Sequence, residues 1–464
     1  MFKTETYINR RPRLSSILKT GVVLILGNSS SPMNYISNEY KFRQDSNFLY
    51  FFGIDLPNLA GVIDIDENKQ YIFGNDPNIE DIIWTGPLQG VKENAAKVGI
   101  TNVGTLDQLT EFIKNVLSQK RTIHFLPPYR AENMLWLERL LNIPSLQTAK
   151  HASLDLIKAI IALRSIKDGE EIAEMDHACD IAYEMHTTAM NITAPDVYEY
   201  EIAGVIEGIA AATNGTLSYQ TILSKHGEIL HSHEHNNLLK TGDLLLIDAA
   251  SETELHYASD ITRVIPVGGK FSQKQREIYE IVLDANNNTH NTAKPNIKYL
   301  EIHRMAAKII ASGLKDLGIM RGSLDDIVAE GAHALFFPHG LGHMLGLDAH
   351  DMEDLGEEYV GYNEEVKRIH QFGIEYLRLG KQLEVGFTLT NEPGIYFIPE
   401  LIDIWQAEKK FVEFINYEKV NEYRTFSGIR LEDDILITEN GCRLLGKRRV
   451  PITIDEVEAI TGIK

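Results

Sequence analysis

Apolar residues in the first 150 positions fall into short runs that are separated by stretches with helical periodicity. The runs have the length and the β-branched content that are typical of buried strands, and they read GVVLIL, AGVIDI, KQYIFG and RTIHFL. Residues 94–99 and 107–119 repeat their apolar positions at helical spacing instead. This alternation of strands and helices predicts an α/β domain of about 150 residues at the N-terminus.

A helix start marks the end of this domain. Asp168 can cap a helix whose first turn carries Glu170 and Glu171, and apolar residues follow it at helical spacing. We therefore expect a first domain over residues 1–160 and a second over residues 161–464. Further helices of the second domain are predicted over residues 199–213, 273–289 and 299–317.

Composition and charge limit the classes of partner. The 464 residues are 44% hydrophobic and 24% charged, as in ordinary globular proteins. The 45 basic and 66 acidic residues give a net charge of −21, which disfavours binding to nucleic acid and to anionic membranes. No apolar run approaches the roughly 18 residues of a membrane span. Neither nucleic acid nor a membrane is expected as a partner.

The cysteine content bears on the cellular compartment. Only Cys179 and Cys442 occur, so one long-range disulfide is possible but a disulfide framework is not. The apolar run Val22–Leu26 near the N-terminus is too short for a signal peptide and is typical of a buried strand. A cytoplasmic location is the simpler expectation.

Carboxylates stand inside or at the end of apolar runs in the second domain. Asp248 ends a four-residue apolar run, where an unpaired buried carboxylate would be costly. Asp260 repeats the pattern, and a hairpin turn at residues 252–254 would place the two carboxylates opposite each other on paired strands. Each one alone is consistent with an ion pair or with a residue at a strand end.

Two further carboxylates extend this pattern toward the C-terminus. Glu392 stands at a predicted strand end, where Pro393 and Gly394 break the ladder. In a later strand, the period of two places Arg430 and Glu432 on one face. Four such carboxylates together indicate a shared site rather than four separate ion pairs.

Histidines form two clusters. His339, His343 and His350 lie within twelve residues and are interspersed with glycines, which disfavours a regular helix. The pair His339 and His343 is not the zinc motif of a metalloprotease helix, because Gly340 stands where that motif requires Glu. The second cluster consists of three alternating histidines that would share one face of a strand, or else form a polar solvated edge strand: His231, His233 and His235.

The ligand chemistry favours a dinuclear metal site. Four carboxylates and one imidazole form an oxygen-rich set that suits Mn²⁺, Fe²⁺, Co²⁺ or Zn²⁺. The four carboxylates and a bridging hydroxide together carry a charge of −5, and two divalent ions carry +4. Arg430 can neutralise the remaining −1, whereas a single divalent ion would leave a charge of −3 buried. Two ions roughly 3.5–4 Å apart would activate a shared water for attack on a carbonyl. The predicted chemistry is metal-assisted amide hydrolysis.

Five sequence blocks in this order resemble a known family, the pita-bread metallopeptidases: LLIDAA, ASDITR, HGLGHMLGLDAHD, LTNEPGIYF and GIRLEDDILIT. That family includes Xaa-Pro aminopeptidases (aminopeptidase P), prolidases and methionine aminopeptidases. Residues 40–53, YKFRQDSNFLYFFG, resemble the N-terminal domain of the first two, which methionine aminopeptidases lack. Creatinase shares the fold but lacks this ligand set. The resemblance implies an α/β (α+β) chain, with a creatinase-like N-terminal domain followed by a pita-bread catalytic domain.

The resemblance also assigns metal ligands. It implies that Asp248 holds one metal ion, that Asp260 and Glu432 bridge both ions, and that His343 and Glu392 hold the other. Glu392 would also take a proton from the attacking water.

The remaining roles that the resemblance implies concern the substrate. His231 and His350 would bind it and stabilise the tetrahedral intermediate. Arg430 would orient Asp248, and Tyr219 and His339 match family positions near the pocket.

Two more positions have alternative interpretations. Trp84 resembles a tryptophan that in some family members reaches the pocket of a neighbouring subunit, or else it is a local core residue. Arg378 stands where prolidases carry an arginine that captures the free carboxylate of a dipeptide, or else it is a solvated helix residue.

The resemblance thus predicts an Xaa-Pro aminopeptidase that acts on peptides with proline in second position. The alternative is prolidase, an Xaa-Pro dipeptidase with the same dinuclear site, which Arg378 and the long insert over residues 351–386 favour. A metal-free binding protein on the same fold is the third possibility. Mn²⁺ is the expected metal, with Zn²⁺, Co²⁺ or Fe²⁺ as alternatives, and the expected assembly is a homodimer or a homotetramer.

Overall fold

The computed structural model describes residues 1–462 and divides into two compact units. The first unit comprises residues 1–164 and the second begins at residue 165. This division falls four residues after the expected boundary, because the helix α7 (Leu154–Arg164) belongs to the first unit. Among residues 1–462, no helix combines the length and the apolar character required to cross a membrane.

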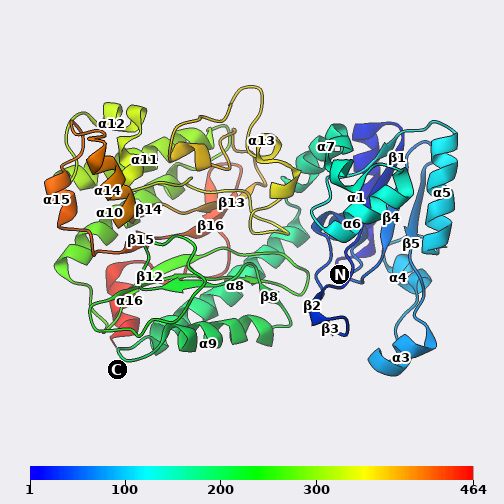
Figure 1. Ribbon diagram of the computed structural model, residues 1–464, viewed down its shortest axis with the longest axis horizontal. Helices are drawn as coiled ribbons and strands as arrows, with labels where there is room; N and C mark the ends of the chain where they lie inside the picture. The colour runs from blue at the N-terminus through cyan, green and yellow to red at the C-terminus, as the bar shows by residue number, and fades with distance from the viewer. Residues whose placement is uncertain (463–464) are drawn as a thin grey trace. The chain divides into compact units, whose positions relative to one another are not determined.

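The first unit is built around a mixed five-stranded sheet (Figure 1). The strands follow the order β6-β5-β4-β1-β7, and their bounds are β1 Val22–Leu26, β4 Ala60–Asp64, β5 Lys69–Phe73, β6 Asn102–Gly104 and β7 Ile123–His124. The neighbours of β4 are antiparallel to it, whereas β1–β7 and β5–β6 are parallel. All four apolar runs of the sequence therefore contribute strands, as expected.

Helices and a small hairpin complete this unit. The remaining helices are α1 Thr4–Leu18, α2 Ser46–Phe52, α3 Ile79–Thr85, α4 Val91–Lys97, α5 Leu106–Ser118, α6 Ala131–Leu141 and the 3₁₀ helix η1 Ser145–His151. The hairpin consists of β2 Pro32–Tyr35 and β3 Asn38–Glu39. Apolar residues of α5 and α6 pack with β1 and β4 in one core, which includes Leu24, Val62, Ile113 and Leu137. Burial of this core is the main source of stability of the unit.

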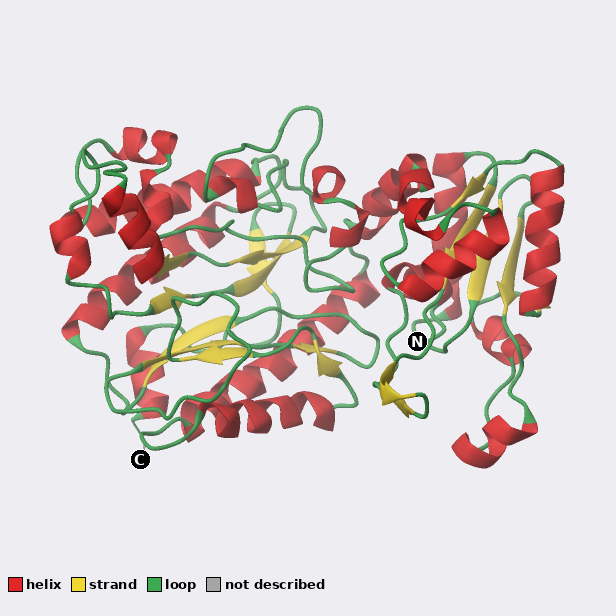
Figure 2. Ribbon diagram, in the orientation of Figure 1, coloured by secondary structure: helices red, strands yellow, loops and turns green. Residues whose placement is uncertain are grey.

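The second unit contains several short sheets flanked by long helices (Figure 2). The strands are β8 Thr216–Leu217, β9 Ile222–Ser224, β10 Leu244–Asp248, β11 Ser251–Glu252, β12 Thr262–Pro266, β13 Thr388–Asn391, β14 Gly394–Tyr396, β15 Gly428–Arg430, β16 Asp433–Ile437 and β17 Cys442–Leu444. They form the sheets β12-β10-β9, β11-β8, β13-β16-β17 and β14-β15.

The helices of this unit are α8 Gly169–Ile192, α9 Glu199–Ala212, α10 Gln273–Thr292, α11 Tyr299–Asp316, α12 Leu324–Glu330, α13 Glu357–Val360, α14 Pro399–Ala407, α15 Tyr417–Asn421 and α16 Ile454–Thr461. Short 3₁₀ helices are η2 Ala332–Leu335, η3 Glu353–Leu355 and η4 Ile374–Tyr376. Helix α8 packs against α9 and β11, and α10 packs against α11, β13, β14 and β15. These two helix pairs support the strands that carry the candidate site.

Local signals account for the start of α8. The side chain of Asp168 accepts hydrogen bonds from the backbone N–H groups of Glu170 and Glu171, and the side chain of Glu171 accepts from the N–H of Asp168. This reciprocal capping box satisfies N–H groups that a helix start otherwise leaves without partners. The helix therefore begins where the sequence predicts it.

Candidate metal centre

The carboxylates Asp248 and Asp260 approach each other, although they do not lie opposite on paired strands. Asp248 is the last residue of β10, and its partner on β12 is Thr262 rather than Asp260. The chain between them forms the expected hairpin, because Glu252 bridges Ala258 in the same antiparallel register and the N–H of Thr253 donates to the carbonyl of Tyr257, which places the turn at residues 253–257. Asp260 precedes β12, and its backbone N–H donates to Oδ2 of Asp434 at 2.8 Å.

Glu392 and Glu432 both lie at strand breaks, which was predicted for Glu392 but not for Glu432, which was expected within a strand. Glu392 follows β13 and precedes β14, whereas Glu432 lies between β15 and β16. Because β13 pairs with β16 and β14 pairs with β15, the chain passes from one small sheet to the next at both breaks. At its break, Glu432 donates its backbone N–H to the carbonyl of Thr262 at 3.1 Å. The two breaks are thus adjacent, and both carboxylates reach the same site.

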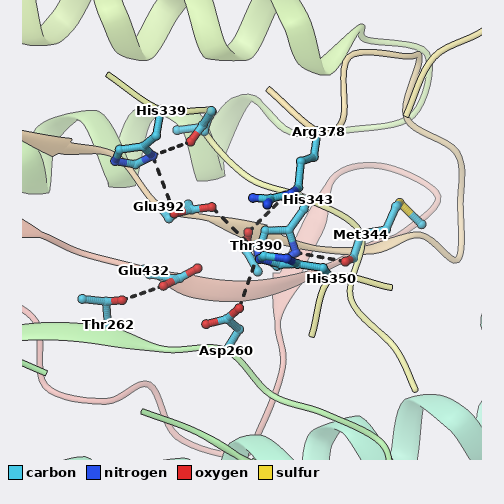
Figure 3. Close-up of polar contacts among 12 residues, drawn as sticks. Asp260, Thr262, His339, His343, Met344, His350, Arg378, Thr390, Glu392 and Glu432 are labelled. Atoms are coloured by element: carbon cyan, nitrogen blue, oxygen red, sulfur yellow. Dashed lines mark hydrogen bonds and ion pairs between the residues drawn. The ribbon is translucent and has the colours of Figure 1, made fainter. Parts of the chain in front are cut away.

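His343 brings an imidazole to these carboxylates (Figure 3). Its Nε2 lies 3.4 Å from Oδ2 of Asp260 and 3.9 Å from Oε1 of Glu392. Its Nδ1 donates to the carbonyl of Met344 at 3.0 Å, so Nε2 is the nitrogen that faces the carboxylates. Burial lowers the pKa of His343, but the hydrogen bond and charge of Asp260 outweigh it and raise that pKa to about 9.

A glycine allows the segment that carries His343 to lie close to β13. A Cβ atom at Gly342 would come within 2.1 Å of the carbonyl oxygen of Thr390. The hydroxyl of Thr390 accepts the backbone N–H of His343 at 3.2 Å. The glycines between the histidines thus serve close backbone packing at this point.

The site concentrates negative charge in a buried place. Burial, followed by neighbouring carboxylates, raises the pKa of Glu432 well above its usual range, and burial raises the pKa of Glu392 to about 7. Burial also raises the pKa of Asp248. For Asp260, the hydrogen bond from His343 overcomes burial and leaves the pKa lowered. Buried like charges of this kind require a compensating cation.

One arginine supplies part of that compensation. Arg430 donates to Oδ2 of Asp248 through a short contact, and its Nε lies 4.0 Å from Oε2 of Glu432. Asp260, His343 and Glu432 each offer a ligand atom, and these atoms all lie within 4.8 Å of one another. The number of carboxylates and the oxygen-rich donor set fit divalent metal ions better than a set of unpaired buried charges.

Two residues that the sequence reasoning missed hold Arg430 and Glu432 in place. The hydroxyl of Thr262 donates to Oε2 of Glu432 at 2.6 Å and accepts from Nε of Arg430 at 3.1 Å. The hydroxyl of Tyr396 accepts from Arg430 at 3.0 Å. Thr262 belongs to the block ASDITR and Tyr396 to the block LTNEPGIYF, so their place beside expected metal ligands in these blocks could have indicated that they lie at the site.

Tyr219 and His339 lie beside the carboxylates, as expected. The Tyr219 hydroxyl contacts Oδ1 of Asp248 and lies 2.7 Å from Oδ1 of Asp260. Nδ1 of His339 donates to the carbonyl of Gly340 at 2.7 Å and lies 3.7 Å from Oε2 of Glu392. Burial, together with the charge of Arg430, lowers the pKa of His339 to about 3, so this imidazole is neutral.

The cluster of three histidines after β9 does not form a strand. Residues 229–237 form turns and irregular loop, and the backbone carbonyls of His235 and Asn237 accept from the N–H groups of Tyr200 and Glu199 at the start of α9 instead of from a neighbouring strand. His231 is exposed on this loop, yet burial and the charges of Arg430 and Arg378 lower its pKa.

His350 packs against His343, with ring centroids 4.4 Å apart. Its Nδ1 lies 2.6 Å from Oε2 of Glu353. Arg378, which follows η4 and is not a helix residue as one interpretation required, donates through Nε to Oε1 of Glu357 at 2.9 Å. Figure 3 shows the side chain of Arg378 on the same side of the site as His343 and His350.

Trp84 belongs to the first unit and is not a core residue. It lies in α3, of which no residue is buried, and its exposed fraction is 80%. The two thiols are also accounted for, since Cys179 and Cys442 are both free. The long-range disulfide that the sequence left possible does not form.

Comparisons with known proteins give consistent matches. The family model of metallopeptidase family M24 matches residues 173–439, and that of the aminopeptidase P N-terminal domain matches residues 7–124. The chain is 30% identical to the Xaa-Pro dipeptidase of Homo sapiens, over 97% of this chain and 90% of that protein. It is 32% identical to the Xaa-Pro aminopeptidase of Escherichia coli, over 94% and 93%.

Solved structures agree with these matches. Zinc-substituted aminopeptidase P of E. coli in complex with product has a TM-score of 0.81 and 30% identity, and the alignment covers 99% of this chain and 98% of that chain. The E. coli aminopeptidase P structure with the inhibitor Pro-Leu has the same TM-score at 29% identity and the same coverage.

Proposed function

Because this chain belongs to metallopeptidase family M24, we propose that it hydrolyses the bond between an N-terminal residue and a following proline. The family and the pita-bread fold expected from the five sequence blocks are confirmed by the family match and the structural likeness. The chain is accordingly a metal-dependent peptidase. The observation that carries the proposal is the convergence of three buried carboxylates, the half-buried Glu392 and His343 near Arg430.

We propose that Asp248 holds one divalent ion, that Asp260 and Glu432 contact two, and that His343 and Glu392 hold the second. When bound, such ions supply Lewis acidity toward the scissile carbonyl and the attacking water. The geometry supports this assignment, because Asp260, His343 and Glu432 each offer a ligand atom and these atoms lie within 4.8 Å of one another, while burial raises the pKa of Glu432 as expected for a carboxylate without a cation. Mn²⁺ is the proposed metal, and Zn²⁺, Co²⁺ and Fe²⁺ are alternatives, since an oxygen-rich set does not select among them by affinity alone.

The side chains around the metal ions take the remaining catalytic roles. Glu392 accepts a proton from the attacking water and passes it to the leaving proline nitrogen. Arg430 orients Asp248 through their short contact. His231 and His350 bind the substrate and stabilise the tetrahedral intermediate as negative charge develops on the carbonyl oxygen.

His339 has a different part, because its imidazole is neutral. It accepts the Tyr396 hydroxyl at Nε2 at 2.9 Å, while Tyr396 accepts from Arg430. The pair Tyr396 and His339 thus fixes the arginine that orients Asp248. Tyr219, hydrogen-bonded to both aspartates, keeps their carboxylates side by side.

The proposed substrates are peptides with proline in second position, and aminopeptidase activity is the main proposal. Prolidase activity is the second candidate, because Arg378 lies close enough to the histidines for its charge to lower the pKa of His231 and His350. An arginine in that place can pair with the carboxylate of a bound dipeptide.

Product analysis tests both proposals. The protein, supplied with Mn²⁺, is given Gly-Pro and Arg-Pro-Pro, and the products are separated by chromatography. Release of Arg from the longer peptide establishes the aminopeptidase, and cleavage of Gly-Pro alone establishes the dipeptidase. If neither is cleaved and metal analysis after reconstitution finds less than one equivalent, the metal-free binding protein becomes the better interpretation.

We also propose that the chain forms a homodimer or a homotetramer in the cytoplasm and that α3 takes part in the contact. Ile79, Ile83 and Trp84 on this helix have exposed fractions of 72%, 70% and 80%. Apolar side chains gathered on an exposed segment are typical of interaction surfaces, and two free thiols suit a reducing compartment. In this proposal Trp84 reaches the pocket of a neighbouring subunit. Light scattering of Ile83→Glu is expected to show smaller particles than the unaltered protein.

A further inference from the structure

A network of charged side chains runs through the insert over residues 351–386 and ends at the candidate site. Glu357 accepts from both Arg368 and Arg378. A second oxygen partner of Arg378 is Oε1 of Glu353, which lies 3.6 Å from a guanidinium nitrogen. The other oxygen of Glu353 lies 2.6 Å from Nδ1 of His350. Glu353 therefore connects the arginine of the insert to the imidazole that packs against His343.

We infer that Glu353 is a specificity-determining residue that occupies Arg378 in place of a substrate carboxylate and so disfavours free dipeptides relative to longer peptides. The inference rests on the proposed function, because it concerns which Xaa-Pro substrates the site accepts. It assigns the charged insert, which has no other part in the proposed chemistry, to substrate selection.

The electrostatics of the network support this role. Arg378 already faces two carboxylates, Glu353 and Glu357, within 4 Å. The carboxylate of a bound dipeptide would be a third one beside Arg378. It would approach a guanidinium whose charge Glu353 and Glu357 already neutralise, and Glu353 would repel it. The hydrogen bond from His350 lowers the pKa of Glu353 to about 2, so this carboxylate keeps its charge near neutral pH.

The exposure of the pair makes the effect moderate. The side chains of Glu353 and Arg378 are 42% and 35% exposed, so solvent screens their interaction and a ligand can reach it. Displacement of Glu353 has a second cost, because it removes the partner of His350 Nδ1. A substrate without a free carboxylate near Arg378 avoids both costs.

Paired substrates isolate the carboxylate. Hydrolysis of Gly-Pro and of Gly-Pro amide, which lacks the free carboxylate, is measured with the Mn²⁺-loaded full chain, and the ratio of their kcat/KM values is compared between variants. Glu353→Gln keeps an acceptor for His350 Nδ1 but removes the negative charge beside Arg378. This variant is expected to raise the Gly-Pro to Gly-Pro amide ratio about two- to fivefold, mainly through a lower KM for Gly-Pro.

Three further variants complete the test. Glu358→Gln is the matched control, because Glu358 lies in the same insert but pairs with Arg368 and is 57% exposed. Its ratio is expected to equal that of the unaltered chain. Arg378→Ala is expected to lower the ratio, and Glu353→Gln in the Arg378→Ala background is expected to change it no further.

The outcomes separate this inference from the proposed function. An unchanged ratio in Glu353→Gln, or an increase that persists without Arg378, overturns the role of Glu353 while Xaa-Pro hydrolysis stands. Absence of hydrolysis of either substrate and of Arg-Pro-Pro by the unaltered chain overturns the proposed function itself, and with it the inference. Thermal unfolding of each variant identifies any loss of folding, and Glu353→Ala provides a second removal of the charge.

Discussion

His343 and Asp260 make the contact that joins two distant segments at the candidate metal centre, with Nε2 of the imidazole 3.4 Å from Oδ2 of the carboxylate. The carbonyl of Met344 holds the other ring nitrogen, so the orientation of the ring is fixed. The Tyr219 hydroxyl lies 2.7 Å from the other carboxylate oxygen of Asp260. The contact therefore places an imidazole beside a group of carboxylates that Arg430 compensates only in part, and substitutions can test the charge balance of this group.

The first prediction concerns Glu432, whose carboxylate is buried and whose pKa burial and neighbouring acids raise well above its usual range. In the metal-free chain this group costs stability, so Glu432→Gln is expected to raise the melting temperature by about 2 °C or more. With metal supplied, the same variant is expected to bind fewer ions. Calorimetry and metal analysis check the two results, with Glu358→Gln as the control. A metal-free variant that melts below the unaltered chain contradicts the charge argument.

The second prediction concerns Thr262, which holds Glu432 and Arg430 at once through its hydroxyl. Thr262→Val keeps the shape of the side chain but removes both hydrogen bonds, so the affinity for Mn²⁺ is expected to fall about 10- to 100-fold. Titration against a chelating dye measures this affinity without relying on activity. Thr262→Ser, which keeps the hydroxyl, should bind the metal nearly as well as the unaltered chain; equal losses in both variants would point to packing instead.

Local patterns in the sequence predict elements well where their determinants are local. The capping box of Asp168 with Glu171 satisfies its own N–H groups, and α8 begins as predicted. The four apolar runs of the first unit become strands, because their length and apolar content are local signals for a strand.

The sequence grouped the residues of the candidate site, but it placed some of them on other parts of the fold than the structure does. The sequence correctly placed Glu392 at a strand end, but it placed Asp260 and Glu432 on strands, whereas the structure has them at breaks between strands. Such breaks depend on which strands pair across the sheet, and that pairing is non-local. The proposed role of Glu353 also depends on non-local contacts, because it follows from the positions of His350 and Arg378 and not from a motif around Glu353.

The third prediction concerns Tyr396, whose hydroxyl joins Arg430 to His339. Tyr396→Phe leaves a buried donor of Arg430 and a buried acceptor of His339 without this partner, which costs about 1–3 kcal/mol. We expect kcat/KM for Arg-Pro-Pro to fall about tenfold or more with the bound metal unchanged. Tyr417→Phe is a matched control, since that hydroxyl donates to the carbonyl of Lys410 outside the site. Undiminished turnover by Tyr396→Phe would remove Tyr396 from the group that orients Arg430.

The last prediction concerns acid stability and His333, which is buried in η2, with Nδ1 3.4 Å from the carbonyl of Ile327. Burial lowers its pKa to about 4, whereas an unfolded histidine titrates near about 6.5. Between these values the unfolded chain binds a proton that the folded chain excludes. The contribution of His333 to the free energy of unfolding is therefore fully present above about pH 6.5, and it is lost as the pH falls toward 4.

His333→Asn removes the titrating ring and is expected to make the loss of unfolding free energy between pH 7 and pH 5 smaller by about 2 kcal/mol. Urea unfolding at both pH values measures it, with EDTA present so that acid-driven metal release does not contribute. His151 is exposed, so His151→Asn should leave the pH dependence as it is in the unaltered chain. If His333→Asn loses as much stability toward pH 5 as the unaltered chain, the acid sensitivity arises from groups other than this buried imidazole.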